Sequence, residues 1–230
     1  MTDIHTHILP CIDDGSGSVE ESLALLSLER TQGVNAVVLT PHFYGARESL
    51  NDFLTRRQWA WDKLQPHLPE NAPTLVLGAE TAWFPSLGKL ERLERLCMGD
   101  SGNILLELPF ERWSTRLFDQ IYDFSCATGL TPILAHVERY LSMQGKKRIQ
   151  DLIDLGFPMQ VNADSLLGLW GRHRCLTLLK RGTWYLGSDC HDLQTRPPRL
   201  GQALGQLKKL DPARIGRMTS WNAERGVEDL

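Results

Sequence analysis

Short apolar segments rich in β-branched residues recur along the chain, and each of them ends in polar residues. Segments of this kind predict buried strands of a parallel sheet, because strands covered on both faces show continuous apolar runs instead of alternation. Seven such segments cover residues 3–8, 35–40, 74–77, 103–106, 132–135, 158–162 and 183–187.

Sequence with a helical pattern separates these segments. Ser18 and Glu21 form a capping box that predicts a helix start, and Gly33 predicts its end. Further apolar helix faces are predicted at Leu117, Ile121 and Phe124 before Gly129, at Cys175, Leu178 and Leu179 before Gly182, and at Leu200, Ala203, Leu204 and Leu207 after Pro197 and Pro198. Residues 45–57 form the most polar stretch and are expected to be a loop.

Strands that alternate with helices predict βα units and a parallel sheet. With 230 residues and 42% hydrophobic composition, the chain is long enough to bury a sizeable core in one domain. A single α/β barrel and a doubly wound sheet both fit this length. The chain has no internal repeat and no linker-like segment, so we expect one domain over residues 1–230.

Charge and cysteine usage narrow the functional classes. A net charge of −3 gives no electrostatic reason to bind nucleic acid or anionic membranes. Strand-like sequence begins at Asp3, which leaves no room for a signal peptide, and no apolar run reaches membrane-spanning length. The five cysteines include no C-x-x-C pair, which is typical of free thiols in a reducing compartment. We therefore expect a cytoplasmic protein.

Candidate chemistry collects where the predicted strands end. His5 and His7 alternate along the first strand, so both imidazoles are expected on one face as a chelating pair. In βα folds the carboxyl ends of the strands gather at one side of the sheet. Five of the seven histidines fall at such ends or beside them, together with four carboxylates: His5, His7, His42, His136 and His191, with Asp14, Glu80, Glu107 and Asp189.

These nine groups are too many for one tetrahedral ion and suit two or three ions that share a carboxylate. With three divalent ions, four carboxylates and a bridging hydroxide, the pocket would carry a net charge of about +1. Such a pocket attracts a phosphate dianion, and Arg139 follows the fifth strand where its fork can hold phosphoryl oxygens. The pattern predicts metal-assisted hydrolysis of a phosphoester.

In order, the motifs DIHTHILPCIDDG, TPHF, LGAE, LLELPF, AHVERY, QVNADSLLG and GSDCHD followed by RPP resemble the PHP (polymerase and histidinol phosphatase) superfamily. More narrowly, they resemble the PHP-type protein-tyrosine phosphatases of bacterial capsule and exopolysaccharide operons. The resemblance runs from residue 1 to about residue 200.

This resemblance implies a distorted (β/α)7 TIM-like barrel, the PHP fold, with three divalent metal ions. It implies Mn2+, with iron or zinc as the other first-row candidates. By motif, the first ion would be held by His5, His7 and Asp189, and Glu80 would bridge it to a second ion. The second ion would also be held by Glu107 and His136. The third would be held by Asp14, His42 and His191. Arg139 and Arg196 match arginines expected near the phosphate.

The resemblance also implies the substrate, namely phosphotyrosine on a bacterial tyrosine kinase that controls polysaccharide export. A histidinol-phosphatase-like activity, or another small-molecule phosphoesterase activity, is the alternative within the same site. A metal-stabilised scaffold without turnover is disfavoured, because all nine ligand positions are filled.

Three features admit a second interpretation. Cys11 stands where the family commonly has glycine, and Cys190 where it has a small residue, so each is either a redox-sensitive thiol beside the metals or a small buried residue, the latter being favoured. Cys175 and Arg181 match the C-x5-R pattern of cysteine phosphatases, but the intervening LTLLK is typical of a helix and not of a glycine-rich phosphate loop. The aromatic residues at the strand ends form either a substrate rim or core cover: Phe43, Tyr44, Trp83, Phe84, Phe110, Trp113 and Tyr140.

Overall fold

The computed structural model of the chain describes residues 1–168, 172, 175 and 183–210. Within these residues the strands are parallel and form two sheets, with the orders β1-β2-β4 and β3-β5-β6-β7-β8-β9. Their bounds are β1 Thr2–Thr6, β2 Ala36–Leu39, β3 His42–Phe43, β4 Thr74–Leu77, β5 Glu80–Ala82, β6 Asn103–Glu107, β7 Thr131–Leu134, β8 Met159–Asn162 and β9 Trp184–Gly187.

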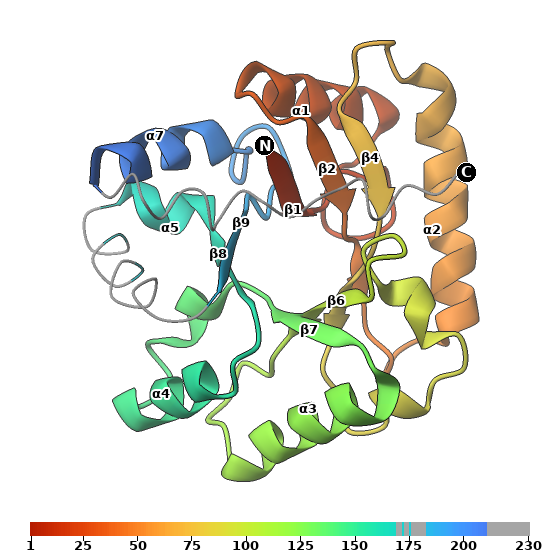
Figure 1. Cartoon of the computed structure of the whole chain (residues 1–230). Coiled ribbons are helices and arrows are strands. Elements are labelled where there is room, and N and C mark those ends of the chain that lie inside the picture. The colour runs from red at the N-terminus through yellow and green to blue at the C-terminus, as the bar shows by residue number, and fades with distance from the viewer. Residues whose placement is uncertain (169–171, 173–174, 176–182, 211–230) are drawn as a thin grey trace.

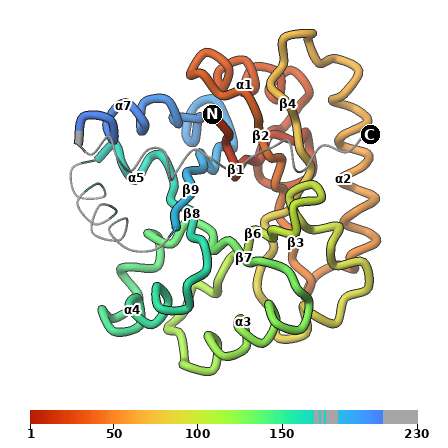
Figure 2. Tube along the Cα trace, viewed as in Figure 1, coloured from red at the N-terminus to blue at the C-terminus, as the bar shows by residue number. Residues whose placement is uncertain are grey.

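The strands are arranged as a ring, seen along its axis in Figure 1. Residues 40–41 lead from β2 into β3 and residues 78–79 lead from β4 into β5, so two segments of chain pass from the first sheet to the second. In Figure 2 the tube runs round the ring until β9 lies beside β1. There, the Asp189 N–H donates to the His5 carbonyl at 2.8 Å and the His7 N–H donates to the Cys190 carbonyl at 2.9 Å. The predicted α/β fold is confirmed, with a strand ladder that is not continuous round the ring.

The helices lie outside the ring (Figure 1). They are α1 Val19–Thr31, α2 Leu50–Leu64, α3 Thr115–Thr128, α4 Lys146–Asp154, α5 Ala163–Leu167 and α7 Leu200–Leu210, with the 3-10 turns η1 Gln65–His67, η2 Leu87–Lys89, η3 Leu93–Leu96 and η4 Val137–Tyr140. Between β5 and β6 the chain makes only η2 and η3, so the expected alternation of strand and helix is interrupted there. None of the helices in the described part of the chain combines the length and apolarity needed to cross a membrane.

The predicted cap at Ser18 and the predicted helix ends at Gly33 and Gly129 are present, whereas the predicted end at Gly182 lies outside the described residues. The Ser18 hydroxyl accepts from the Glu21 N–H at 3.2 Å, while the Glu21 carboxylate accepts from the Gly17 N–H at 2.8 Å. The reciprocal bond of the capping box thus reaches one residue further back than the motif predicts. Gly33 and Gly129 have φ of +86° and +72°, the left-handed conformation that ends a helix and favours glycine.

The prediction of a loop over residues 45–57 is wrong from residue 50 onward, because α2 begins there. Ser49 caps this helix by accepting from the Asp52 N–H at 3.2 Å. Leu50, Phe53 and Leu64 are buried on its inner face, but Arg57 is buried in the same stripe. A charged residue within the apolar face weakens the helical periodicity from which the sequence is read.

All seven predicted strands are present with ends within two residues of the predicted ones. The two short strands β3 and β5 were not predicted, because two or three residues carry no hydrophobic pattern. The predicted helix over Cys175, Leu178 and Leu179 lies outside the described residues, apart from Cys175 itself.

Two layers of apolar side chains flank the strands. A small buried cluster takes members from β1, β2, β4, β6 and β7, and Tyr185 of β9 packs against it: Ile4, Val38, Val76, Met98, Leu105, Ile133 and Ala135. Because these strands form the ring, this cluster fills the ring's interior. The residues that alternate with them, such as Val37 and Leu106, belong to the larger cluster under the helices. The interior is therefore a packed support for whatever lies at the strand ends.

Gly187 at the end of β9 lies too close to its neighbours to carry a side chain. A Cβ atom there would lie 2.7 Å from the His5 Cβ and 2.9 Å from the Gln160 Nε2. We expect Gly187→Ala to lower the free energy of unfolding by about 1–3 kcal/mol, measured by urea denaturation in the presence of a chelator. Gly205→Ala is the matched control, because α7 leaves open space at that Cβ, and it should stabilise by about 0.5–1 kcal/mol. Equal effects of the two substitutions would contradict this account of the ring.

Candidate active site

Two histidines of the first strand segment face each other at the centre of the site. The Nε2 atoms of His5 and His7 lie 3.2 Å apart. The Glu80 Oε2 lies 3.2 Å from the His5 Nε2 and 3.3 Å from the His7 Nε2, and the Asp189 Oδ1 lies 3.5 Å from each. All four side chains are buried. The predicted chelating pair is therefore oriented toward two carboxylates.

Glu80 at the start of β5 links this group to a second one. Its Oε1 lies 2.8 Å from the His136 Nε2, and the Glu107 Oε1 lies 3.4 Å from the same nitrogen. Its Oε2 also lies 3.0 Å from the His42 Nδ1. The two oxygens of one buried carboxylate thus face different sets of imidazoles.

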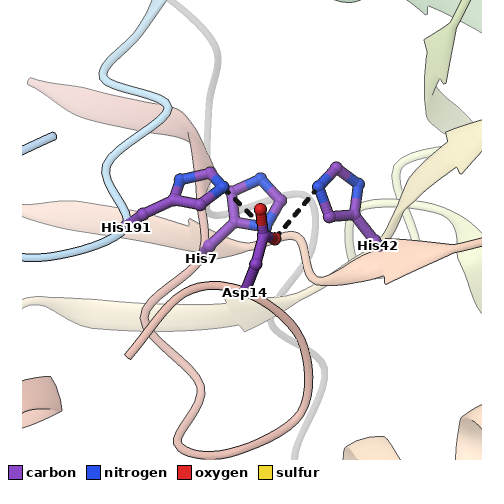
Figure 3. A group of neighbouring side chains, drawn as sticks. All are labelled: His7, Asp14, His42 and His191. Carbon is purple, nitrogen blue, oxygen red and sulfur yellow. Dashed lines mark ion pairs between the residues drawn. The ribbon is translucent and has the colours of Figure 1, made fainter. Parts of the chain in front are cut away.

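A third group lies at the more open side of the site (Figure 3). Asp14 reaches back from the loop after β1, and its Oδ1 lies 3.4 Å from the His42 Nε2 and 3.5 Å from the His191 Nε2. The His7 ring lies between these histidines, with its centroid 4.0 Å from that of His191 and 4.5 Å from that of His42. Asp14 is exposed while the histidines are largely enclosed.

The structure brings all nine predicted ligand residues together, from the ends of strands that are far apart in the sequence. Potential ligand atoms lie within 4.8 Å of one another in three overlapping groups: His5, His7 and Glu80; His42, Glu80 and Glu107; and His7, Asp14, His42 and His191. The buried His191 Nε2 and His42 Nδ1 face carboxylates without making a hydrogen bond. This set of imidazole and carboxylate donors fits divalent metal ions.

Two of these residues have left-handed backbone conformations. His136 has φ of +31° and Asp189 has φ of +54°, although neither is glycine. The Gln160 Oε1 accepts from the His136 N–H at 2.7 Å, and the His5 carbonyl accepts from the Asp189 N–H. Backbone strain of this kind persists where surrounding contacts enforce it, and it clusters at functional sites.

The mutual charges of the metal-free site shift the pKa values of its members. Burial alone would lower the pKa of His7, but hydrogen bonds to Asp13 and Glu80 outweigh it and raise the pKa to about 10. Burial is likewise outweighed at His136, whose bonds to Glu107 and Glu80 raise the pKa to about 9. Burial would raise the pKa of Glu80, but His5 and the other imidazoles hold it well below its ordinary value.

Two residues that hold the site, Asp13 and Gln160, are not among the nine predicted ligands. The Asp13 Oδ2 accepts from the His7 Nδ1 at 2.8 Å and from the His42 N–H at 2.9 Å, so Asp13 orients two histidines while Asp14 faces the third group. Gln160 contacts His5 at 3.0 Å. A polar residue at a buried position of the predicted strand 158–162 was the available signal for Gln160.

Both predicted phosphate-binding arginines lie beside Asp189. The Arg196 Nη2 lies 2.7 Å and the Arg139 Nη1 3.7 Å from the Asp189 Oδ2, and both side chains are about two-fifths exposed. They open onto a cavity of about 340 Å³, which is lined by Arg139, Asn162, Asp164, Ser188, Asp189, Arg196 and Pro197. The cavity therefore combines two cationic forks with access from solvent.

The strand-end aromatic residues divide into two sets. Phe43, Trp113 and Tyr140 are buried in the core, and Trp83 and Phe84 pack against it. Phe110 is 46% exposed, its ring stacks on His136 at 5.7 Å, and the Arg139 guanidinium lies 4.8 Å from its centroid. Tyr44 stacks on His42 with ring centroids 5.1 Å apart, and the Arg47 guanidinium lies 4.7 Å from the Tyr44 centroid.

The buried Cys175 thiol is poorly suited to act as a nucleophile. Burial raises the pKa of the Cys175 thiol to about 12, which opposes thiolate formation, and the remainder of the C-x5-R match lies outside the described residues. Cys190 is buried, as the favoured interpretation expects. That interpretation is wrong for Cys11, which is exposed. Its φ of +57° explains why glycine suits the position.

The raised pKa values of His7 and His136 predict how the metal-free protein responds to pH. A histidine whose folded pKa lies above the unfolded value of 6.5 stabilises the fold fully below pH 6.5, and loses this effect as pH rises toward about 10. We expect the free energy of unfolding to fall between pH 6.5 and about 8.5, below the titration of ordinary thiols. His7→Gln should flatten this slope in chelator-treated protein, whereas His67→Gln at an exposed position of η1 should not. Stability that rises across this range would contradict the assignment.

The sequence matches one protein family and is similar to curated tyrosine-protein phosphatases. A family model described as capsular polysaccharide synthesis, CpsB/CapC, matches residues 1–228. The chain is 33% identical to the tyrosine-protein phosphatase CpsB of Streptococcus pneumoniae over 229 residues, which cover 91% of this chain and 90% of that protein. It is 30% identical to the tyrosine-protein phosphatase YwqE of Bacillus subtilis (strain 168) over 235 residues, with 97% and 90% covered.

Solved structures agree on the fold. The chain superposes with a TM-score of 0.78 and 24% identity on a structure from a study of YwqE and CpsB. The superposition covers 98% of this chain and 94% of that one. The study describes YwqE and CpsB as unique metal-dependent tyrosine phosphatases. A phosphotriesterase homology protein from Escherichia coli, with phosphate in its active site, gives a TM-score of 0.51 at 14% identity, with 94% of each chain covered.

Proposed function

The chain belongs to the CpsB/CapC family, and on that premise we propose that it is a metal-dependent phosphatase that hydrolyses phosphotyrosine in proteins. The observation that carries the proposal is the convergence of nine imidazole and carboxylate side chains, Glu80 among them, directly beside two partly exposed arginines. Metal-ligating donors next to cationic forks are the parts that hydrolysis of a phosphate monoester needs.

We propose three divalent ions, with Mn2+ as the first candidate. His5, His7 and Asp189 would hold one, Glu107 and His136 another, with Glu80 shared between them, and Asp14, His42 and His191 the third. The three geometric groups match this division in part, with overlaps at His7, His42 and Glu80. His136 and Asp189 belong to none of these groups, but His136 lies 2.8 Å from Glu80 and Asp189 lies 3.5 Å from both His5 and His7. When bound, such ions activate water and stabilise negative charge on phosphoryl oxygens.

The chain's own residues would bind and orient the phosphate. Arg139 of η4 and Arg196 of the loop after β9 line the cavity from two different segments, so their guanidinium groups can contact separate oxygens of one phosphoryl group. Asp189 lies within 4 Å of both guanidinium groups and fixes their positions. The burial of the histidine pair below keeps bulk water away from the reacting centre and strengthens its electrostatic interactions.

The aromatic residues support an aryl phosphate as the substrate. Phe110 is a large apolar side chain left half exposed between the ligand His136 and the phosphate-binding Arg139. If the phosphate of a phosphotyrosine lies in the arginine cavity, its phenol ring can stack on the exposed part of the Phe110 side chain. We therefore favour phosphotyrosine over histidinol phosphate, whose imidazole is more polar.

In the cell, the proposed partner is a bacterial tyrosine kinase that controls capsule or exopolysaccharide export, and the proposed location is the cytoplasm. The capsular description of the family supports the first, and five free cysteines support a reducing compartment. We further propose one domain over residues 1–230, since a large core cluster joins residues from Ile8 to Leu207.

The central test is turnover in chelator-stripped protein with Mn2+ added back. A phosphotyrosine peptide should be hydrolysed, in preference to histidinol phosphate, only after metal is restored. His136→Ala and Asp189→Asn should lower kcat at least about 100-fold, because each removes a proposed ligand. Cys175→Ser should retain activity. An inactive Cys175→Ser variant, or turnover indifferent to metal, would contradict the proposal.

Phe110→Ala tests the aryl specificity by itself. Loss of a stacking partner worth about 1–1.5 kcal/mol should raise the KM for a phosphotyrosine peptide roughly tenfold and change the KM for histidinol phosphate much less. Tyr122→Ala, at an aromatic residue exposed on α3, is the matched control and should change neither KM. Parallel losses on both substrates in Phe110→Ala would show that Phe110 does not contact the ring.

A further inference from the structure

Two amide side chains of β8, the buried Gln160 and the half-buried Asn162, connect ligand residues from opposite ends of the sequence. The Gln160 Oε1 lies 3.0 Å from the His5 Nδ1 and accepts from the His136 N–H at 2.7 Å. The Gln160 Nε2 donates to the Asn162 Oδ1 at 2.8 Å, and the Asn162 Nδ2 donates to the Asp189 Oδ2 at 2.7 Å. A continuous chain of hydrogen bonds thus runs from His5 to Asp189.

The groups at the two ends of this hydrogen-bond chain allow only one assignment of donors and acceptors along it. A backbone N–H such as that of His136 can only donate, so the Gln160 atom that faces it must be the carbonyl oxygen. The NH2 group of Gln160 therefore faces Asn162, whose own NH2 group is turned toward Asp189. An ionised carboxylate can only accept, which matches that arrangement. Neither amide can flip without placing two donors or two acceptors in contact.

This order of donors and acceptors determines the tautomer of His5, the backbone conformation of His136 and the orientation of the Asp189 carboxylate. The Gln160 oxygen requires a proton on the His5 Nδ1, which leaves Nε2, the nitrogen directed at His7 and Glu80, as the atom that can bind a metal ion. The same oxygen holds the His136 backbone at its φ of +31°. Asn162 and Arg196 both contact the Asp189 Oδ2, so the Oδ1 remains directed at His5 and His7.

The backbone of Asn162 is held in turn by the Glu138 carboxylate. The Asn162 N–H donates to the Glu138 Oε1 at 3.3 Å, and that same oxygen accepts from the Ser165 hydroxyl at 3.1 Å. Asn162 also lines the cavity that contains Arg139 and Arg196. The chain of amides therefore links the buried histidines to the cavity proposed for the phosphate.

We propose that Gln160 and Asn162 are positioning residues, a one-directional hydrogen-bond relay that sets the tautomer of His5 and the orientation of Asp189 for metal binding. This inference rests on the proposed function only in taking His5 and Asp189 as metal ligands. Neither Gln160 nor Asn162 contacts the substrate's reacting atoms in this scheme, and their effect passes through the ligands.

Gln160→Glu and Asn162→Asp test the relay, because each is nearly isosteric and reverses one contact. In Gln160→Glu, Asn162 must turn its NH2 group toward the new carboxylate and its oxygen toward Asp189. In Asn162→Asp, a carboxylate oxygen faces Asp189 directly. We expect each variant to bind Mn2+ about 10–100-fold more weakly than the wild type, measured by calorimetry on chelator-stripped protein.

The direction of the change in Mn2+ affinity distinguishes an effect on ligand orientation from an effect of the added charge. Each substitution adds a negative charge near the ions, which by Coulomb attraction alone would strengthen Mn2+ binding. Gln202→Glu, at an exposed position of α7, makes the same chemical change away from the site and should leave the affinity unchanged. Tighter or unchanged Mn2+ binding in Asn162→Asp would overturn the relay. Because Asn162 is only half buried, that variant remains a valid test if Gln160→Glu does not fold.

A spectroscopic measurement tests the tautomer independently of turnover. In 15N-imidazole-labelled, metal-free protein, at a pH at which the His5 ring is neutral, the wild type should show His5 protonated at Nδ1, and Gln160→Met should show a mixture of the two tautomers. A retained Nδ1–H tautomer in Gln160→Met would overturn the role of Gln160. Wild-type protein that binds Mn2+ but does not hydrolyse phosphotyrosine would contradict the proposed function and leave the relay intact.

Discussion

A carboxylate buried among imidazoles is the interaction on which this site depends. Glu80 is almost inaccessible to water, and its two oxygens lie within 3.3 Å of nitrogens from His5, His7, His42 and His136. An isolated buried carboxylate would be strongly destabilising, so the histidines compensate it in the metal-free protein and hold its pKa low. Cations held by these donors would compensate the same charge, which is why this arrangement is compatible with both a folded metal-free protein and a metal-loaded one.

The fold supplies the geometry that this cluster needs through local departures from regular structure. Where β4 gives way to β5, the chain passes between the two sheets and delivers Glu80 to the site. His136 and Asp189 occupy left-handed conformations directly after their strands. Beneath them, the apolar cluster inside the ring gives a rigid support, since closely packed interiors resist displacement. The irregular residues lie at the site, and the regular packing lies below it.

Burial divides the site into two parts with different tasks. His5, His7 and Glu80 are fully enclosed, which suits donors that must keep fixed positions. Arg139, Arg196 and Phe110 are each about two-fifths to one-half exposed, which suits groups that must meet a substrate on another protein. Asp189 belongs to both parts, since one of its oxygens faces the histidine pair and the other faces the arginines. A change at Asp189 therefore alters both the proposed metal binding and the phosphate cavity.

The sequence by itself determined seven of the nine described strands, the caps at Ser18, Gly33 and Gly129, and the identity of the clustered residues, because these depend on local patterns. Apolar runs locate the strands, and parallel strands bring their carboxyl ends together, so His42 and Asp189 could be grouped without knowledge of their contacts. Only the tertiary structure decided that Asp13 orients His7 while Asp14 faces His42, that Arg57 is buried within α2, and that Cys11 is exposed. It alone decided that Gln160 of β8 lies beside His5 of β1. The physical reason is that closure of the ring sets distances between residues more than 150 positions apart, and no local periodicity encodes such a distance.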